Sequence, residues 1–196
     1  MNYKDILGWM TEYDLDVISD LAKLVPENSI IVEVGSMFGR SAACWATHTP
    51  KTADIYCIDN WYSFYIQEHP FSEATCLENK FPLSNKQYDL LAEFKNNTKS
   101  FANIKMIQGN CPSGTPWNNI PIDLFFLDAS HTNPSDWEII EYFLPFIKTN
   151  GIICGHDYDK NQFPDVVENV SKLESVFNTK VVLFQNSSIW MINKNG

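Results

Sequence analysis

The sequence is poor in basic residues, and this shortage argues against one large class of partners. Lys and Arg number 14 against 24 Asp and Glu, so the 196-residue chain has a formal net charge of −10 at pH 7. Binding along a nucleic-acid backbone needs clustered basic side chains, so we expect no nucleic-acid partner. The sequence also lacks an apolar run of the ~18 residues that cross a membrane, and we expect no membrane partner.

Patterned cysteines and a secretory leader are missing as well. The five cysteines are an odd number and contain no Cys-x-x-Cys pair, which argues against a disulfide framework and a cysteine zinc site. The first residues, MNYKDILGWM, do not show a basic stretch followed by an apolar one, the pattern of a signal peptide. We therefore expect a cytoplasmic protein with free thiols.

What the chain does have is a regular alternation of two hydrophobic periods. Short apolar runs typical of buried strands alternate with stretches whose apolar residues recur at helical spacing. Expected strands cover residues 29–35, 54–59, 101–109, 121–128, 152–155, 180–184 and 188–192. Expected helices cover residues 14–25, 40–48, 86–98 and 165–177, and a further helix opens at residues 132–134 and kinks or ends at Pro145.

This alternation predicts a single α/β domain over residues 1–196, with a Rossmann-like, doubly wound, mostly parallel seven-stranded sheet. Only residues 185–187 join the last two strands, too few for a helical crossover, so a C-terminal strand should run antiparallel. Residues 61–85 are rich in aromatic side chains and form an unusually long connection. We expect them to be a lid insert over a substrate, with a flap or a dimer contact as the alternative.

The first expected strand ends in a glycine-containing loop, EVGSMFGRS, at the edge where such sheets bind ligands. Gly35 and Gly39 allow close approach of the backbone to a ligand, and the next helix offers free N–H groups. The Gly-x-x-x-Gly spacing lacks the middle glycine that makes room for a pyrophosphate. Glu33 would repel phosphate and suits a ligand amino group. An ordinary tight turn between strand and helix is the alternative.

The next two strand ends carry polar residues that suit a nucleoside. Asp59 follows Gly39 by 20 residues, an offset at which an acid accepts hydrogen bonds from ribose hydroxyls. Asn110 ends the third strand, where an adenine edge could be read. A loop acid and plain Gly-Asn turn chemistry are the respective alternatives.

The fourth and fifth strand ends each deliver an acid and a histidine, as Asp128 with His131 and as His156 with Asp157. Three of these side chains could hold a divalent cation, for which the carboxylates favour magnesium or calcium. The fourth could act as a general base, because histidine titrates near neutrality. Taken singly, either histidine could equally be a structural residue.

Taken in order, EVGSMFGRS, CIDNWY, IQGN, DLFFLDASH and NGIICGHDY resemble the successive motifs of class I S-adenosylmethionine (SAM)-dependent methyltransferases. The similarity is greatest to methyltransferase domain family 24, and more distant to the metal-dependent catechol and caffeoyl-CoA O-methyltransferases. It spans about residues 30–158. The resemblance implies SAM as cofactor, a divalent cation (Mg²⁺, Mn²⁺ or Ca²⁺), and methylation of a hydroxyl on a small-molecule acceptor.

The resemblance also implies roles for individual residues. It assigns cofactor binding to Glu33, Gly35, Ser36, Gly39, Ser41, Asp59 and Asn110. Asp128, His156 and Asp157 fall at the metal-ligand positions, and His131 falls where the metal-dependent relatives carry a catalytic lysine, so Asp128 and His131 are the expected catalytic residues. Histidine replaces an acid at 156, which opens the site to metals other than magnesium. Few residues precede the first strand, so a substrate cover would have to come from residues 61–85 or from the partner subunit of a homodimer.

Two other functions stay open at this point. An NAD-dependent oxidoreductase could use a similar sheet, although the missing middle glycine counts against it. A non-catalytic SAM- or nucleotide-binding or interaction module would explain the change from lysine to histidine at 131 without any chemistry.

Overall fold

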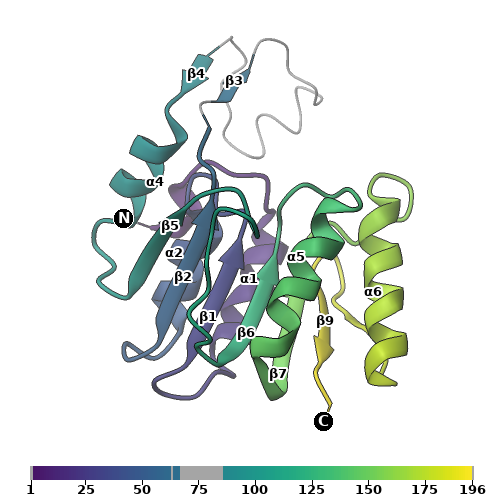
Figure 1. Ribbon diagram of the computed structural model, residues 1–196. Coiled ribbons are helices and arrows are strands. Elements are labelled where there is room, and N and C mark those ends of the chain that lie inside the picture. Colours follow the sequence, from purple (N-terminus) through teal and green to yellow (C-terminus); the bar gives the residue numbers. More distant parts are fainter. Residues whose placement is uncertain (1, 63, 67–85, 196) are drawn as a thin grey trace.

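The computed structural model describes residues 2–62, 64–66 and 86–195 (Figure 1). Its helices, with η marking 3₁₀ helices, are η1 (Tyr3–Asp5), α1 (Glu12–Ala22), α2 (Arg40–His48), α4 (Leu90–Thr98), α5 (Ser135–Phe143), η2 (Leu144–Phe146) and α6 (Pro164–Phe177). Its strands are β1 (Ile30–Val34), β2 (Asp54–Asp59), β3 (Phe64–Ile66), β4 (Lys86–Tyr88), β5 (Ile104–Gln108), β6 (Ile122–Leu127), β7 (Ile147–Gly155), β8 (Val182–Leu183) and β9 (Trp190–Asn193).

A central seven-stranded sheet has the order β5-β2-β1-β6-β7-β9-β8. The first five strands in this order are parallel, and β9 runs antiparallel to both β7 and β8. The expected doubly wound sheet with an antiparallel C-terminal strand is thus confirmed. β3 and β4 pair with each other as a separate antiparallel ribbon.

Helices cover the sheet on both faces, with α1 and α2 on one side and α5 and α6 on the other (Figure 1). The side chains of β6 alternate between these layers. Leu124 and Phe126 pack in the core with α1 and α2, whereas Phe125 and Leu127 pack in the core with α5 and α6. A strand buried on both faces reads as a continuous apolar run, which is why its position was visible in the sequence.

Two segments differ from the sequence-based expectation. The helix expected over residues 86–98 begins only at Leu90, because residues 86–88 form β4 and the Asp89 side chain caps the helix by accepting from the Ala92 N–H. The strand expected over residues 152–155 begins earlier, because Asn150 and Gly151, a pair typical of turns, lie inside β7. An irregularity in the β6–β7 register accommodates the turn residues.

The end of α5 agrees with the sequence-based expectation, whereas most of the expected lid lies outside the described residues. α5 ends at Phe143 and Pro145 lies in the short η2, as the proline predicted. Of the lid expected over residues 61–85, residues 63 and 67–85 lie outside the described residues. Within the part of the chain that the structure describes, no helix is long and apolar enough to cross a membrane.

Asp123, near the start of β6, ties three strands together and offers a test of the sheet. Its Oδ2 accepts from the Ile30 N–H of β1 at 2.9 Å, and its Oδ1 accepts from Lys148 Nζ of β7 at 2.8 Å. Asp123→Ala leaves the Ile30 N–H without this acceptor, so we expect the free energy of unfolding in urea to fall by about 1–3 kcal/mol. Lys148→Ala, which removes only the exposed ion pair, should cost at most about 1 kcal/mol. Equal losses in the two variants would contradict this reading.

Candidate functional site

A cleft with a volume of about 510 Å³ opens at the carboxyl ends of β1, β2, β5 and β6. This volume falls in the range of about 300–1,000 Å³ that is usual for small-molecule sites. Five predicted site residues line it, namely Gly35, Asp59, Asn110, Asp128 and His131. Ser36 and Ser41 line a smaller cavity of about 30 Å³, which shares Gly35 and Asp128 with the cleft. Glu33 and Gly39 line neither space.

The loop between β1 and α2 needs its glycines for conformation and for space. Gly35 and Gly39 adopt φ values of 92° and 86°, in the left-handed region. A Cβ at Gly35 would lie 1.7 Å from the backbone oxygen of Asp128, and one at Gly39 would lie 2.8 Å from Thr98 Cγ2. The end of β1 therefore lies directly against the end of β6, which brings the loop next to Asp128.

Glu33 is a buried carboxyl at the base of this loop. Its Oε2 accepts from Trp45 Nε1 at 3.1 Å. Among the residues that the structure describes, Glu33 Oε1 and Ser36 Oγ have no hydrogen-bond partner. Burial raises the pKa of Glu33 to about 7. Ser36 lines the smaller cavity, whereas Glu33 lies behind the glycine loop and lines neither space, so Ser36 is the polar group of this pair that a ligand could reach.

Asp59 and Asn110 stand on the other side of the cleft. Asp59 Oδ2 accepts from the Met37 N–H at 2.9 Å and its Oδ1 accepts from the Trp61 N–H at 2.8 Å, so Asp59 ties the loop after β1 to the end of β2. Each carboxylate oxygen can accept more than one hydrogen bond, which leaves capacity for ribose hydroxyls. Asn110 Nδ2 lies 3.4 Å from the Tyr62 hydroxyl. Both residues are placed where a nucleoside could lie.

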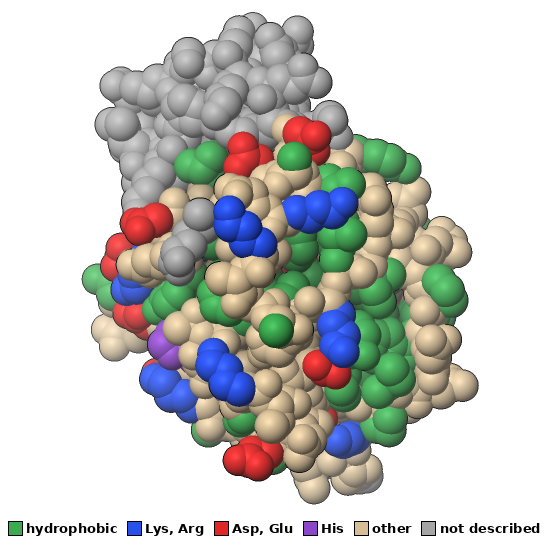
Figure 2. Space-filling model, turned by 90° about the vertical axis from the view of Figure 1, so that its left-hand side faces the viewer, with side chains coloured by type: hydrophobic (Ala, Val, Ile, Leu, Met, Phe, Trp, Pro, Cys, Tyr) green, Lys and Arg blue, Asp and Glu red, His purple; other side chains and the backbone are tan. Residues whose placement is uncertain are grey.

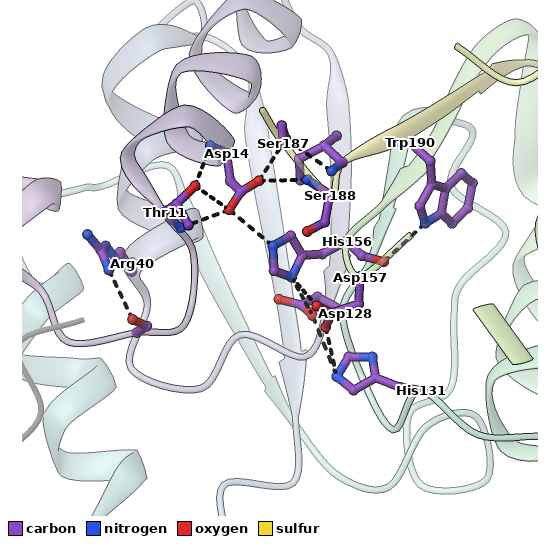
Figure 3. Close-up of polar contacts among 12 residues, drawn as sticks. Thr11, Asp14, Arg40, Asp128, His131, His156, Asp157, Ser187, Ser188 and Trp190 are labelled. Carbon is purple, nitrogen blue, oxygen red and sulfur yellow. Dashed lines mark hydrogen bonds and ion pairs between the residues drawn. The ribbon is translucent and has the colours of Figure 1, made fainter. Parts of the chain in front are cut away.

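Asp128, His131, His156 and Asp157, called here the strand-end cluster, converge as the sequence predicted (Figure 3). His131 Nε2 lies 3.3 Å from Asp157 Oδ2 and 3.8 Å from Asp128 Oδ1. These three residues each offer one ligand atom within 4.8 Å of the others and could hold a metal ion. His156 approaches the same acids from the buried side, with Nδ1 at 3.3 Å from Asp157 Oδ1 and 3.6 Å from Asp128 Oδ1.

A fifth member, Asp14 of α1, was not found from the sequence. Its Oδ2 lies 3.3 Å from His156 Nε2, so the buried imidazole stands between Asp14 and the two acids of the cluster (Figure 3). Burial alone would lower the pKa of His156, but Asp128, Asp14 and Asp157 together raise it well above the usual range. Burial alone would raise the pKa of Asp14, but the contact with His156 and hydrogen bonds from Ser187 and Thr11 lower it.

The only local signal at Asp14 is the pattern Thr11-x-x-Asp14, which marks a helix start. Both bonds of this capping box are present at the start of α1. Nothing in the pattern indicates the contact with His156, which comes from a distant part of the chain.

The residues before the first strand also contribute to the site, contrary to expectation. Trp9 lines both the cleft and the smaller cavity, and the Gly8 oxygen accepts from Arg40 Nη1 at 3.0 Å. Gly8 packs so closely on Arg40 that a Cβ there would lie 2.9 Å from Arg40 Cδ. The expectation that cover must come from residues 61–85 or from a partner subunit is therefore wrong for this wall of the cleft.

Backbone strain gathers around the cleft. Nine non-glycine residues of the described chain have positive φ, and five of them are asparagines, which tolerate this region. The other four are Met37, Trp61, His131 and Asp157. All four belong to the cleft wall, to the partners of Asp59 or to the strand-end cluster. Strain of this kind is typical of functional sites.

A family model described as a methyltransferase domain matches residues 32–158, more than half of the chain. The chain belongs to this family, methyltransferase domain family 24. The matched range holds the glycine loop, Asp59, Asn110 and the whole strand-end cluster, so the predicted family is confirmed. No curated protein matches the chain in sequence.

Solved methyltransferases share the fold at low sequence identity. A Staphylococcus aureus protein assigned as a caffeoyl-CoA O-methyltransferase has a TM-score of 0.66 at 15% identity, over 97% of this chain and 86% of that one. The O-methyltransferase NovP has a TM-score of 0.65 at 13% identity, over 93% and 79%. An rRNA methylase from Streptococcus thermophilus has a TM-score of 0.60 at 15% identity, over 93% and 97%.

These likenesses identify the fold, and the family match identifies a methyltransferase domain for which SAM is the supported cofactor. The cleft has the glycine loop on one side and Asp59 on the other. The oxidoreductase alternative has no such support.

The raised pKa of Glu33 makes stability depend on pH. The folded methyltransferase holds a proton that the unfolded chain releases above the ordinary value of 4.5, so stability falls as pH rises from 4.5 to about 7. At about 1.4 kcal/mol per pKa unit this amounts to about 3 kcal/mol. We expect Glu33→Gln to remove this loss in the ligand-free protein, measured by urea unfolding across this pH range. Parallel stability curves for the two proteins would contradict the assignment.

Asp59 should matter to cofactor affinity beyond its role in the loop. Asp59→Asn keeps an acceptor but removes the charge, and losing hydrogen bonds to a charged group costs about 1.5–3 kcal/mol. We expect S-adenosylhomocysteine (SAH) to bind about 10–100-fold more weakly by calorimetry. Asp54→Asn, at the opposite end of β2, is the matched control and should leave the affinity unchanged. An unchanged affinity in Asp59→Asn would leave Asp59 a purely structural residue.

Proposed function

We propose that this protein transfers the methyl group of SAM to a hydroxyl of a small molecule, with help from a divalent cation at the strand-end cluster. The observation that carries the proposal is the position of His131. It lines the same cleft as Gly35, Asp59 and Asn110, and its Nε2 lies 3.3 Å from Asp157. The proposed base, His131, and the proposed cofactor loop at Gly35 thus line the same cleft.

The order of residues along the cleft suggests how donor and acceptor are arranged. Asp59 and Asn110 would hold the nucleoside, and the loop at Gly35 would hold the methionine part, which directs the methyl group toward Asp128 and His131. The sulfonium of SAM is already reactive, so the protein mainly has to position the acceptor and remove its proton. His131 is a suitable proton acceptor because imidazole titrates near neutrality.

The strand-end cluster supplies oxygen and nitrogen donors, which are the ligands that divalent cations take in proteins. Asp128, His156 and Asp157 would hold the ion, which leaves His131 free to act as the base. When bound, such an ion lowers the pKa of a coordinated hydroxyl. The imidazole of His131, which packs at 5.0 Å against the ring of Phe163, would then take the proton from the acceptor.

A small acceptor suits the surface better than a nucleic acid does. Figure 2 shows one face of the protein, on which Lys and Arg side chains lie singly among Asp and Glu side chains. With a net charge of −10, a polyanionic substrate would meet overall repulsion. The likeness to an rRNA methylase concerns the fold alone. The cytoplasmic location and the homodimer expected from the sequence stay predictions.

The proposal is tested with SAM and a panel of small phenols, sugars and amines, by following SAH formation. We expect methylation of hydroxyl acceptors, and we expect His131→Gln to lower kcat by about 10²–10⁴-fold with the SAH affinity unchanged, because a lost general base affects the proton transfer. His48→Gln, a substitution at a histidine remote from the cleft, is the matched control.

Three outcomes would change the conclusion. Methylation of amines alone would contradict the choice of hydroxyl. Tight SAH binding without turnover on any acceptor would favour a non-catalytic SAM-binding module. A normal kcat in His131→Gln would remove His131 from the role of base.

A further inference from the structure

We propose that Asp128, His156 and Asp157 of the strand-end cluster form a centre of one histidine and two carboxylates that selects a transition-metal ion such as Mn²⁺ or Zn²⁺ over Mg²⁺ and Ca²⁺, and that Asp14 positions this histidine. The inference rests on the proposed function, since it names the class of cation for the same site. It departs from the magnesium or calcium that the two carboxylates alone would favour.

The first ground is the donor set. Nδ1 of His156 lies 3.3 Å from Asp157 Oδ1 and 3.6 Å from Asp128 Oδ1. Magnesium and calcium take oxygen ligands, whereas imidazole favours zinc, iron, copper and nickel, and mixed imidazole–carboxylate sets are common for transition metals. A nitrogen donor beside the two carboxylates therefore shifts the preference of the centre toward transition metals.

The second ground is the carboxylate behind His156. Nδ1 of His156 faces Asp128 and Asp157, while Nε2 on the opposite side of the ring lies 3.3 Å from Asp14 (Figure 3). Metal-binding histidines almost always donate their second N–H to an outer partner, often a carboxylate, which fixes the ring and makes the ligand more basic. Asp14 lies on that side of the ring at ion-pair distance, and Nε2 has no hydrogen-bond partner among the described residues.

Four hydrogen bonds fix the side chain of Asp14. Its Oδ2 accepts from the Thr11 N–H at 2.8 Å and the Thr11 hydroxyl at 2.7 Å, and its Oδ1 accepts from the Ser187 hydroxyl at 2.7 Å and the Ser188 N–H at 3.1 Å. The side chain is only 4% exposed. A fixed carboxylate holds the imidazole of His156 in a single orientation, with Nδ1 toward the acids.

The experiment titrates metal-stripped protein with Mn²⁺, Zn²⁺, Mg²⁺ and Ca²⁺ by calorimetry, and measures SAH affinity on the same samples. Wild-type protein should bind Mn²⁺ and Zn²⁺ about 100-fold or more tightly than Mg²⁺. His156→Asp, which replaces a nitrogen donor by oxygen, should weaken Zn²⁺ and strengthen Mg²⁺. This change in the ratio separates ligand identity from the general tendency of transition metals to bind more tightly.

Asp14→Asn tests the positioning role. We expect a loss of about 10–100-fold in Zn²⁺ and Mn²⁺ affinity, as is usual when an outer-shell partner is removed. Asp16→Asn makes the same substitution at an exposed site on α1 and should leave metal affinity unchanged. If His156→Asp does not fold, His156→Gln removes the same nitrogen donor with a neutral side chain and should weaken Zn²⁺ binding.

The outcomes separate this inference from the function beneath it. Mg²⁺ binding as tight as Zn²⁺ binding, or Zn²⁺ affinity unchanged in Asp14→Asn and in the variants at His156, would overturn the inference. SAH binding without any metal binding would also overturn it and would leave the methyl-transfer proposal in place. Metal selectivity without SAH binding would support the centre and contradict the proposed methyl transfer.

Discussion

The close contact between the ends of β1 and β6 is the constraint on which the rest of the site depends. Gly35 lies so near the backbone of Asp128 that no side chain fits between them. One strand end carries the glycine loop and the other carries the first acid of the strand-end cluster. The backbone itself therefore places the loop and this acid side by side.

The sequence was sufficient wherever local patterns and sheet geometry decide the outcome. Parallel neighbours end at the same edge of a sheet, so the meeting of His131 with Asp157 could be predicted from two strand ends. Asp14 could not, because its partners come from remote segments: Ser187 is 173 residues away along the chain. The strand at residues 86–88 was missed because its pairing with β3 is likewise non-local.

The electrostatics of the site follow from burial of opposite charges in one place. Glu33 gains no cationic partner among the described residues and is pushed toward its neutral form, whereas His156 gains three acids and is pushed toward its charged form. Both pKa values are thus raised, which favours the neutral form of Glu33 and the charged form of His156. Glu33 at the glycine loop has no cationic partner among the described residues, whereas the strand-end cluster contains its own cation in the charged form of His156.

The hydrogen bonds to Asp14 divide between two distant parts of the chain. Thr11 holds Oδ2 from the start of α1, whereas Ser187 and Ser188, which lie just before β9, hold Oδ1. Both parts must dock before the carboxylate behind His156 is fully fixed, so the support of the cluster belongs to the tertiary fold and not to α1 alone.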